Sequence, residues 1–340
     1  MSSSSPSQLC CWNIRHRPVM AYAAGDSAGR SRALRLFPRT TFKRRVLLGG
    51  VQFLVASHLE ASFCALRESA DELLPAGDLD VLLGWLREAC HEKEIDWLLT
   101  WPARRDRQRL YLIFRSASEQ ASGVVKIGGG EFNCRQFRNE ADALARLAPT
   151  VHPFSTPHVL FERSLAGGRT ALALGGFPAR LHAVSSSQAV AFGLETVLHL
   201  QQLPVPEVRM RLGEAVWFPA FRNAAPAGPA SRLLLDQAAT EIDVGFAHGD
   251  LGPGNMSADG QGGVFLFDWE NASLQAPVQV DPVGLWLACR QRQILRSPQA
   301  MARALSRHLG DPPGNAILFA LAFLCAHGNL AAAKILECWE

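Results

Sequence analysis

The chain has 340 residues, and 34 Lys and Arg against 31 Asp and Glu give it a formal net charge of +3. With 48% hydrophobic residues it can build a sizeable core, which excludes a chain that is disordered throughout. The length predicts about two domains or lobes, and the small net charge leads us to expect no nucleic-acid partner.

Cysteines and apolar runs narrow the class of protein further. The eight cysteines are scattered and form no CxxC pair, so free thiols are expected and a zinc ribbon is not. The longest apolar runs, around Val46–Ala56 and Ala316–Ala326, are shorter than the roughly 20 residues that cross a bilayer. These features predict a cytoplasmic protein without a transmembrane segment.

Two segments precede the first clear strand pattern. Residues 1–46 contain nine Arg and Lys but a single acidic residue, Asp26, so we expect a mobile basic segment. An Arg- and Ser-rich start is also typical of an organelle transit peptide or of a polyanion-binding tail, and both alternatives stay open. Residues 47–94 predict a helical extension, with an apolar helix face at Leu79–Leu86 and Asp78 as its N-cap.

Residues 95–176 predict a small β-rich lobe, because the apolar period changes after residue 94. An amphipathic helix is predicted at Glu131–Leu147. Residues 177–340 predict a larger helical lobe that contains one β-rich island. The sequence therefore predicts an α+β fold with two lobes. The strands predicted for the small lobe are Ile95–Thr100, Arg109–Phe114, Gly123–Ile127, Val159–Glu162 and Thr170–Leu174.

The β-rich island, residues 246–272, carries the most informative pattern. An apolar run ends in His248-Gly249-Asp250, a Gly/Pro loop brings in Asn255, and a second apolar run ends in Asp268. Carboxylate and amide oxygens are the hard ligands that Mg²⁺ prefers, and an Asp outside the metal shell can accept a hydroxyl proton. Phosphoryl transfer needs this combination. The alternative is an Asp- and Gly-rich hairpin whose polar groups only cap turns.

This segment, together with the Trp269-Glu270 pair that follows it, resembles the signature of the aminoglycoside phosphotransferase and choline kinase family. The resemblance extends over about residues 95–309 and implies a protein-kinase-like fold. It implies these roles: Asp250 as catalytic base, His248 as a brace of the loop, and Asn255 and Asp268 as Mg²⁺ ligands, with Glu270 assisting nearby.

The small lobe offers a second test of the resemblance. A kinase-like lobe needs a Lys on its third strand to position phosphates, and a Glu on the next helix to hold that Lys. Lys126 lies in the third predicted strand and Glu140 in the predicted helix, in the required order. Glu131 and Asp142 are rival partners. Alone, either side chain would also fit a solvated surface position, but the ordered pair favours the kinase-like interpretation.

Some positions depart from the family pattern. The loop at residues 101–108 contains no glycine, although a Gly-rich loop lets backbone N–H groups approach phosphates. Its three arginines would meet phosphates by charge or lie exposed. By resemblance, Ala173, Leu174 and Gly175 form the hinge whose backbone would hydrogen-bond adenine. We interpret Asp281 as a structural helix N-cap.

The sequence thus predicts an ATP- and Mg²⁺-dependent kinase that phosphorylates a hydroxyl of a small molecule, such as a sugar, an aminoglycoside or an amino alcohol. The alternative is a pseudokinase that binds nucleotide or a partner without turnover. The acceptor site follows no short motif, and the sequence predicts no oligomeric state. Candidate residues for the acceptor site, chosen by location alone, are Glu195, Asp236, Glu241 and the Trp217–Arg222 loop.

Overall fold

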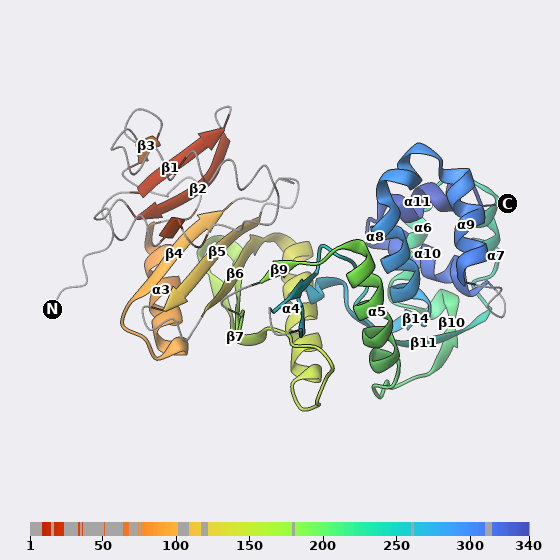
Figure 1. The fold of residues 1–340 in the computed structure, drawn as a ribbon, viewed down its shortest axis with the longest axis horizontal. Coiled ribbons are helices and arrows are strands. Elements are labelled where there is room, and N and C mark those ends of the chain that lie inside the picture. Colours follow the sequence, from red (N-terminus) through yellow and green to blue (C-terminus); the bar gives the residue numbers. More distant parts are fainter. Residues whose placement is uncertain are drawn as a thin grey trace. The chain divides into compact units, whose positions relative to one another are not determined.

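The protein divides into two compact units, and each is described by itself. One unit comprises the described residues of Met1–Ala145 and Thr156–Arg180, and the other those of Arg146–Ser155 and Leu181–Glu340 (Figure 1). The glycine-free loop at 101–108 lies outside the described residues. The computed structural model describes residues 9–14, 17–23, 33–34, 36, 51, 64–67, 74, 76–100, 109–116, 122–178, 181–259, 262–309 and 315–339.

The first unit is built on an antiparallel sheet, in which the described strands follow the order β3-β1-β2-β4-β5-β6-β8-β7. All five strands predicted between residues 95 and 176 belong to it. The strands are β1 Leu9–Ile14, β2 Arg17–Ala23, β3 Cys64–Arg67, β4 Ile95–Thr100, β5 Arg109–Ser116, β6 Ser122–Gly129, β7 His158–Leu165 and β8 Arg169–Gly175.

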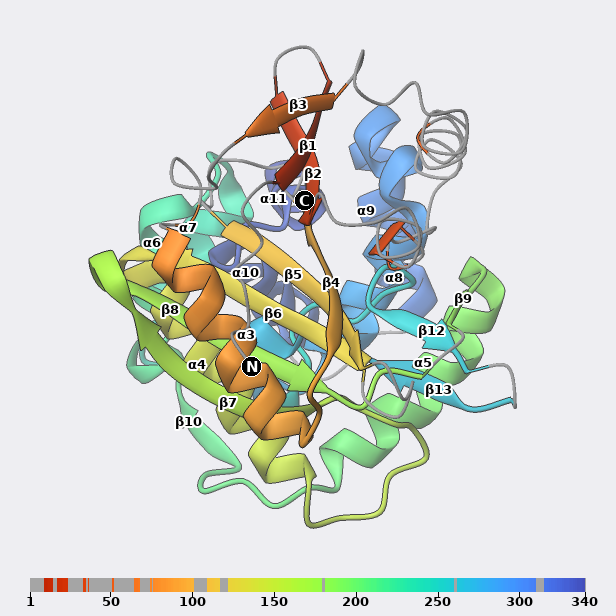
Figure 2. The ribbon, with the colours of Figure 1, turned by 90° about the vertical axis from the view of Figure 1, so that its left-hand side faces the viewer.

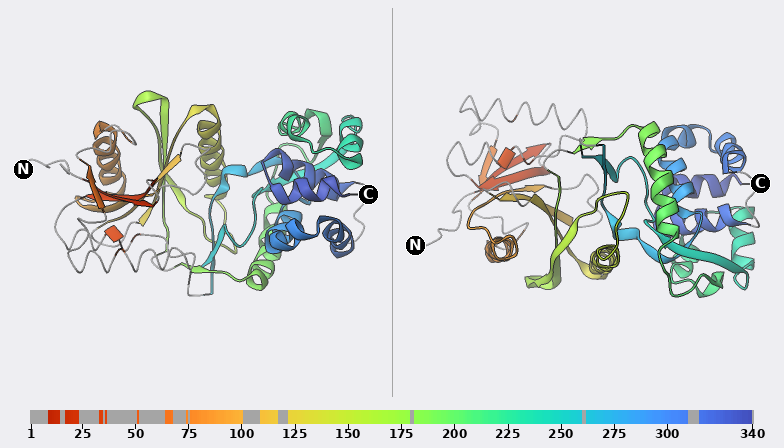
Figure 3. Two further views of the ribbon diagram at one scale, coloured as in Figure 1. Left: turned by 90° about the horizontal axis from the view of Figure 1, so that it is seen from above. Right: turned by 60° about the horizontal axis from the view of Figure 1, so that its bottom comes forward.

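Two helices cover opposite faces of this sheet (Figures 2 and 3). Helix α3, Ala76–Cys90, packs its leucines against every second residue of the central strands, among them Leu112 and Val125. Side chains alternate along a strand, so the residues between these face the other way. There lies α4, Gly130–Leu147, the helix predicted at Glu131–Leu147.

The strands that lie before residue 76 differ from our expectation of a basic tail followed by a helical extension. Strands β1, β2 and β3 extend the sheet, and β2 pairs with β4 through Met20 and Thr100. Trp12, Met20 and Tyr22 are buried in a small second core, where Trp12 Nε1 donates to the Tyr22 hydroxyl over 3.0 Å. The excess of arginine in this part of the sequence hid the short apolar strands.

Asp78 also lies elsewhere than predicted. It is the third residue of α3 and it is buried, so it is not the N-cap of this helix. Its carboxylate instead pairs with the Arg169 guanidinium at the start of β8. The acidic side chain in the first helical turn therefore ties α3 to the sheet.

The second unit is mainly helical. Its short strands form two three-stranded sheets, in the orders β10-β11-β14 and β13-β12-β9. The strands are β9 His182–Ala183, β10 Arg209–Arg211, β11 Glu241–Ala247, β12 Met256–Ala258, β13 Val264–Leu266 and β14 Ser273–Pro277. The helices are α5 Ser186–Gln201, α6 Phe218–Ala224, α7 Pro229–Asp236, α8 Val280–Arg296, α9 Pro298–Leu309, α10 Ala316–Ala326 and α11 Leu330–Glu337.

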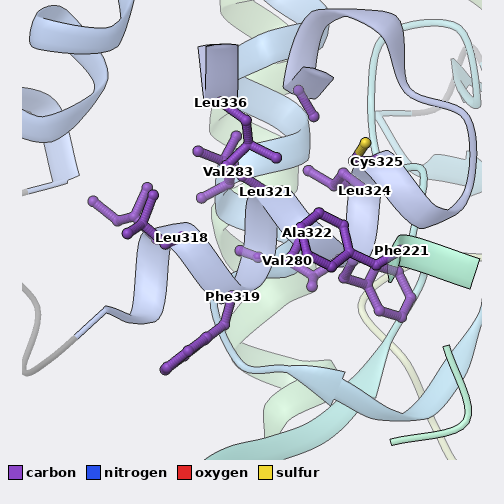
Figure 4. Close-up of a cluster of buried hydrophobic side chains, with 14 of the residues drawn as sticks. Phe221, Val280, Val283, Leu318, Phe319, Leu321, Ala322, Leu324, Cys325 and Leu336 are labelled. Carbon is purple, nitrogen blue, oxygen red and sulfur yellow. The ribbon is translucent and has the colours of Figure 1, made fainter. Parts of the chain in front are cut away.

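Helix α10 is the centre of the core of this unit (Figure 4). Every residue of Ile317–Cys325 is buried, which is the pattern of a helix that is apolar on all sides. It contacts α6, α8 and α11, so Phe221, Val283 and Leu336 share one cluster with it. Among the helices that the structure describes, none has both the length and the apolar character that crossing a membrane requires.

Candidate active site

Lys126 and Glu140 form a buried ion pair in the first unit. Val125 and Ile127 face the core beneath α3, so Lys126 of β6 points to the opposite face, where α4 lies. Its Nζ is 2.6 Å from Oε2 of Glu140, and the two side chains are 7% and 0% exposed. Burying both charges is costly unless they are paired, so this contact fixes the position of each side chain.

Arg109, for which the sequence predicts no role, lies on the same face of the sheet and is buried. Its Nε donates to Asn133 Oδ1 over 2.6 Å, a second nitrogen donates to Gln136, and the guanidinium lies 5.2 Å from the Phe137 ring centre. Gln136 precedes Glu140 by one helical turn. Arg109 therefore anchors the first half of α4 and sets the register in which Glu140 meets Lys126. Nothing in the sequence around an arginine at the start of a strand indicates that it will anchor a helix.

The predicted hinge residues are part of a central strand. Ala173 pairs with Val125 on one side and with Phe161 on the other, and Leu174 has neighbours on both sides in the same way. Backbone groups of a strand between two neighbours serve the sheet ladders. Gly175, the last residue of β8, is likewise paired on both sides, with Gly123 and with His158, so the adenine contact of these three residues stays a prediction.

In the second unit, β11 leads directly into the predicted catalytic loop. Gly249 has φ +80°, and a Cβ there would lie 2.1 Å from the Asn271 carbonyl oxygen, so only glycine fits. The N–H groups of His248 and Gly249 donate to the two carboxylate oxygens of Asp281, over 2.8 and 2.9 Å. Asp281 thus holds the turn in place. Our interpretation of it as an N-cap is wrong, because Gln279 occupies the N-cap position of α8.

The ring of His248 is fully buried and its contacts fix its tautomer. Nε2 lies 3.1 Å from the Phe267 carbonyl oxygen, to which it can only donate, and Nδ1 accepts from the Asp250 N–H over 3.3 Å. The imidazole is therefore neutral and protonated on Nε2. Its ring centre is 4.4 Å from that of Trp269. His248 thus links the catalytic loop to the segment that carries Asp268.

Asp250 and Asn255 contact each other across the loop. Asn255 Nδ2 donates to the Asp250 backbone carbonyl over 2.8 Å and to its Oδ2 over 3.0 Å. Both contacts use the amide nitrogen of Asn255, so its amide oxygen can bind a different group. The Phe267 N–H donates to the Asn255 carbonyl over 3.2 Å, so the hairpin of β12 and β13 places Asn255 beside the residue that precedes Asp268.

Asp268 has a left-handed backbone at φ 70°, which turns the chain sharply after β13. A carboxylate oxygen of Asp268 and one of the buried Glu270 lie within 4.8 Å of each other. Together with the amide oxygen of Asn255, these are hard oxygen donors of the kind that Mg²⁺ binds. The residues present in this unit therefore fit the predicted metal.

The candidates for an acceptor site do not gather in the same way. Glu241 opens β11, so the length of the strand, about 20 Å, separates it from the catalytic loop. Trp217 is buried in the core and its Nε1 donates to the Gln275 carbonyl over 2.9 Å. Glu195 lies exposed on α5, and Asp236 ends α7.

Asp281 gives the site a pH-dependent element. Burial raises the pKa of Asp281 to about 6 from its ordinary 3.8, and the nearby Asp250 charge adds to the rise, while the two backbone donors oppose it. Because the folded-state pKa is the higher one, the folded protein binds this proton more tightly than the unfolded chain. The resulting stabilisation is complete below about pH 4 and is lost as the pH rises to about 6.

We therefore expect the stability difference between the native protein and Asp281→Asn to shrink as the pH rises from about 4 to 6, by at most about 3 kcal/mol, and to stay constant above. Urea unfolding of both proteins at several pH values measures it. A difference that grows over this range would contradict the raised pKa of Asp281.

These contacts define a class of protein. The β-rich unit holds a buried Lys–Glu pair, and the helical unit holds a His-Gly-Asp loop, an Asn and a strand-end Asp. Each set comes together within its own unit. This is the two-lobed, protein-kinase-like α+β fold, and in the described part of the chain strands β1, β2 and β3 and helix α3 precede the kinase-like strands.

Comparison with known families agrees. The model of the phosphotransferase enzyme family matches residues 141–312, which is about half of the chain and includes all of residues 246–272. The chain belongs to this family. A search of curated proteins found no match.

Solved structures with low sequence identity also match. A putative fructosamine-3-kinase from Haemophilus somnus 129PT is 14% identical, with 71% of this chain and 95% of that chain covered and a TM-score of 0.41. The aminoglycoside phosphotransferase APH(4)-Ia, as a thermostable mutant with ADP and hygromycin B, is 13% identical, with coverages of 75% and 94% and a TM-score of 0.45. APH(2″)-IIia with GDP and kanamycin is 12% identical, with coverages of 72% and 88% and a TM-score of 0.44.

Proposed function

We propose that the protein transfers the γ-phosphate of ATP to a hydroxyl group of a small molecule. The observation that carries this proposal is the catalytic loop. Asp281 fixes its two backbone N–H groups, and Asn255 holds the backbone and the carboxylate of Asp250. A loop so constrained presents Asp250, which is exposed, in one defined position.

In this proposal Asp250 orients the acceptor hydroxyl and accepts its proton as the oxygen attacks the phosphoryl group. His248 is a positioning residue. It is neutral and buried, and its ring nitrogens are already engaged by Phe267 and by the Asp250 N–H. A base that must first be oriented reacts more slowly than one already fixed in position. By holding the loop, His248 supports catalysis through the position of Asp250.

Asn255 and Asp268 would hold Mg²⁺, with Glu270 close by. The metal would neutralise charge on the transferring phosphoryl group. Lys126, held by Glu140, would position the phosphates of the nucleotide, as the equivalent pair does in kinases.

The test is ATP consumption by the purified protein with Mg²⁺ against a panel of small hydroxyl compounds, beside calorimetric binding of a non-hydrolysable ATP analogue. We expect Mg²⁺-dependent binding and acceptor-dependent turnover. Absence of nucleotide binding would contradict the proposal. Binding without turnover on any acceptor would favour the pseudokinase alternative, to which the family match lends no support.

A further inference from the structure

From Pro282 onward, helices α8 and α9 carry an unbalanced charge. Between Pro282 and Leu309 the chain has five arginines and no acidic residue. Among the residues that the structure describes, none of these arginines forms an ion pair with a carboxylate. Arg290 lies 4.7 Å over the Trp286 ring, and the other four, Arg292, Arg296, Arg303 and Arg307, are exposed. A surface of this kind attracts anionic groups.

Helix α8 runs alongside the catalytic loop from its first turn. Asp281 accepts hydrogen bonds from the N–H groups of His248 and Gly249. Two turns later Ala288 packs directly against Gly252, because a Cβ added to Gly252 would lie 2.7 Å from that of Ala288. Gly252 follows Asp250 by two residues.

Arg292 is the next residue on the Ala288 face of α8, one helical turn of about 5.4 Å further on. Side chains leave a helix tilted toward its N-terminus, so the Arg292 side chain starts out toward the turn that contains Ala288. That turn is the one that touches the catalytic loop. Arg292 is thus the first exposed arginine beyond the loop, on the side of the helix that faces it.

We propose that the phosphate acceptor carries an anionic group, a carboxylate or a phosphate, and that Arg292 binds this group while Asp250 orients the hydroxyl. This inference rests on the proposed function of the same site. The planar guanidinium pairs with two oxygens of such a group at once. A polycationic acceptor would meet the same positive helix unfavourably. Arg296, one turn further along α8, adds to the attraction.

The first test compares acceptors that differ mainly in charge: glucose, glucosamine, gluconate and glucose 6-phosphate, each with Mg·ATP. We expect the anionic compounds to have the higher kcat/KM, and Arg292→Gln to raise their KM at least about tenfold with little change in kcat. Arg303→Gln is the matched control, since it removes the same charge from α9, and it should leave KM within about twofold. Preference for glucose or glucosamine, or equal effects of both substitutions, would overturn the proposal.

A second measurement does not depend on turnover. It tests the proposal even when none of the four compounds is phosphorylated. Inorganic phosphate and gluconate are titrated separately into protein saturated with Mg²⁺ and a non-hydrolysable ATP analogue. We expect saturable binding of at least one of them, weakened about tenfold or more in Arg292→Gln and unchanged in Arg303→Gln. The stronger of the two identifies the anionic group.

The binding measurement also separates this proposal from the proposed function. No saturable anion binding, or equal binding by Arg292→Gln, would overturn the anionic acceptor. Failure of the ATP analogue itself to bind would instead overturn the kinase. Because Arg292 is exposed, its substitution should leave thermal unfolding unchanged, which confirms that a weaker affinity is not a loss of fold.

Discussion

Replacing Asp250 with asparagine is expected to lower kcat by about 10²–10⁴-fold while the protein stays folded and binds nucleotide. The amide keeps the size of the side chain but cannot accept the hydroxyl proton. Asp250 is exposed, and the loop around it is held by Asp281 and by the buried His248, so the substitution leaves these contacts in place. Steady-state kinetics and calorimetric nucleotide binding on the same sample measure both effects.

The matched control for this prediction is Asp243→Asn. Asp243 lies on β11, the strand that leads into the loop, and its carboxylate pairs with the exposed Arg209 at 2.8 Å. An exposed ion pair contributes about 0–1 kcal/mol, so this variant should keep full activity. Turnover by Asp250→Asn close to that of Asp243→Asn would exclude Asp250 as the base.

Much of the candidate site could be predicted because its residues are close in sequence. His248, Asp250, Asn255 and Asp268 lie within one short segment, so their spacing alone indicates the loop and the hairpin. Lys126 and Glu140 lie on consecutive elements. The alternation of β6 and the helical period of α4 are both visible in the sequence, and together they bring the pair to one face.

Contacts between distant segments could not be predicted. Asp281 resembles an N-cap, because an acidic residue before a proline at a helix start satisfies that local pattern. Its true donors, the N–H groups of His248 and Gly249, lie more than 30 residues earlier. Arg109 is similar, since its partners Asn133 and Gln136 look like ordinary polar positions on α4. Buried polar contacts of this kind depend on which elements pack together, and a local pattern does not show this.

The N-terminal strands could not be predicted for a different reason. Residues 1–46 are rich in arginine, and the apolar Met20 and Tyr22 of β2 lie within this basic stretch. The alternation in such short strands spans only a few residues and is weaker than the surrounding arginine signal. An extension of a sheet is therefore harder to predict than a loop whose chemistry requires particular residues.

Substitution of Lys126 by methionine is expected to destabilise the protein by about 3–5 kcal/mol and to abolish turnover. Methionine keeps the length of the side chain and removes the charge, so Glu140, which is 0% exposed, loses the cation 2.6 Å away. Removing one member of a buried pair leaves the other charge in a medium that solvates it poorly. Urea unfolding gives the free energy, and the ATP consumption assay gives the turnover.

The double variant Lys126→Met, Glu140→Leu separates stability from chemistry. With both charges gone, two apolar side chains fill the space between β6 and α4, and most of the lost stability should return. Turnover should not return, because no cation is left on β6 to position the phosphates. A double variant that regains activity with its stability would show that the pair only holds α4 against the sheet. A stable but inactive double variant would show that Lys126 acts on the nucleotide, and that burying its partner is the cost of fixing it there.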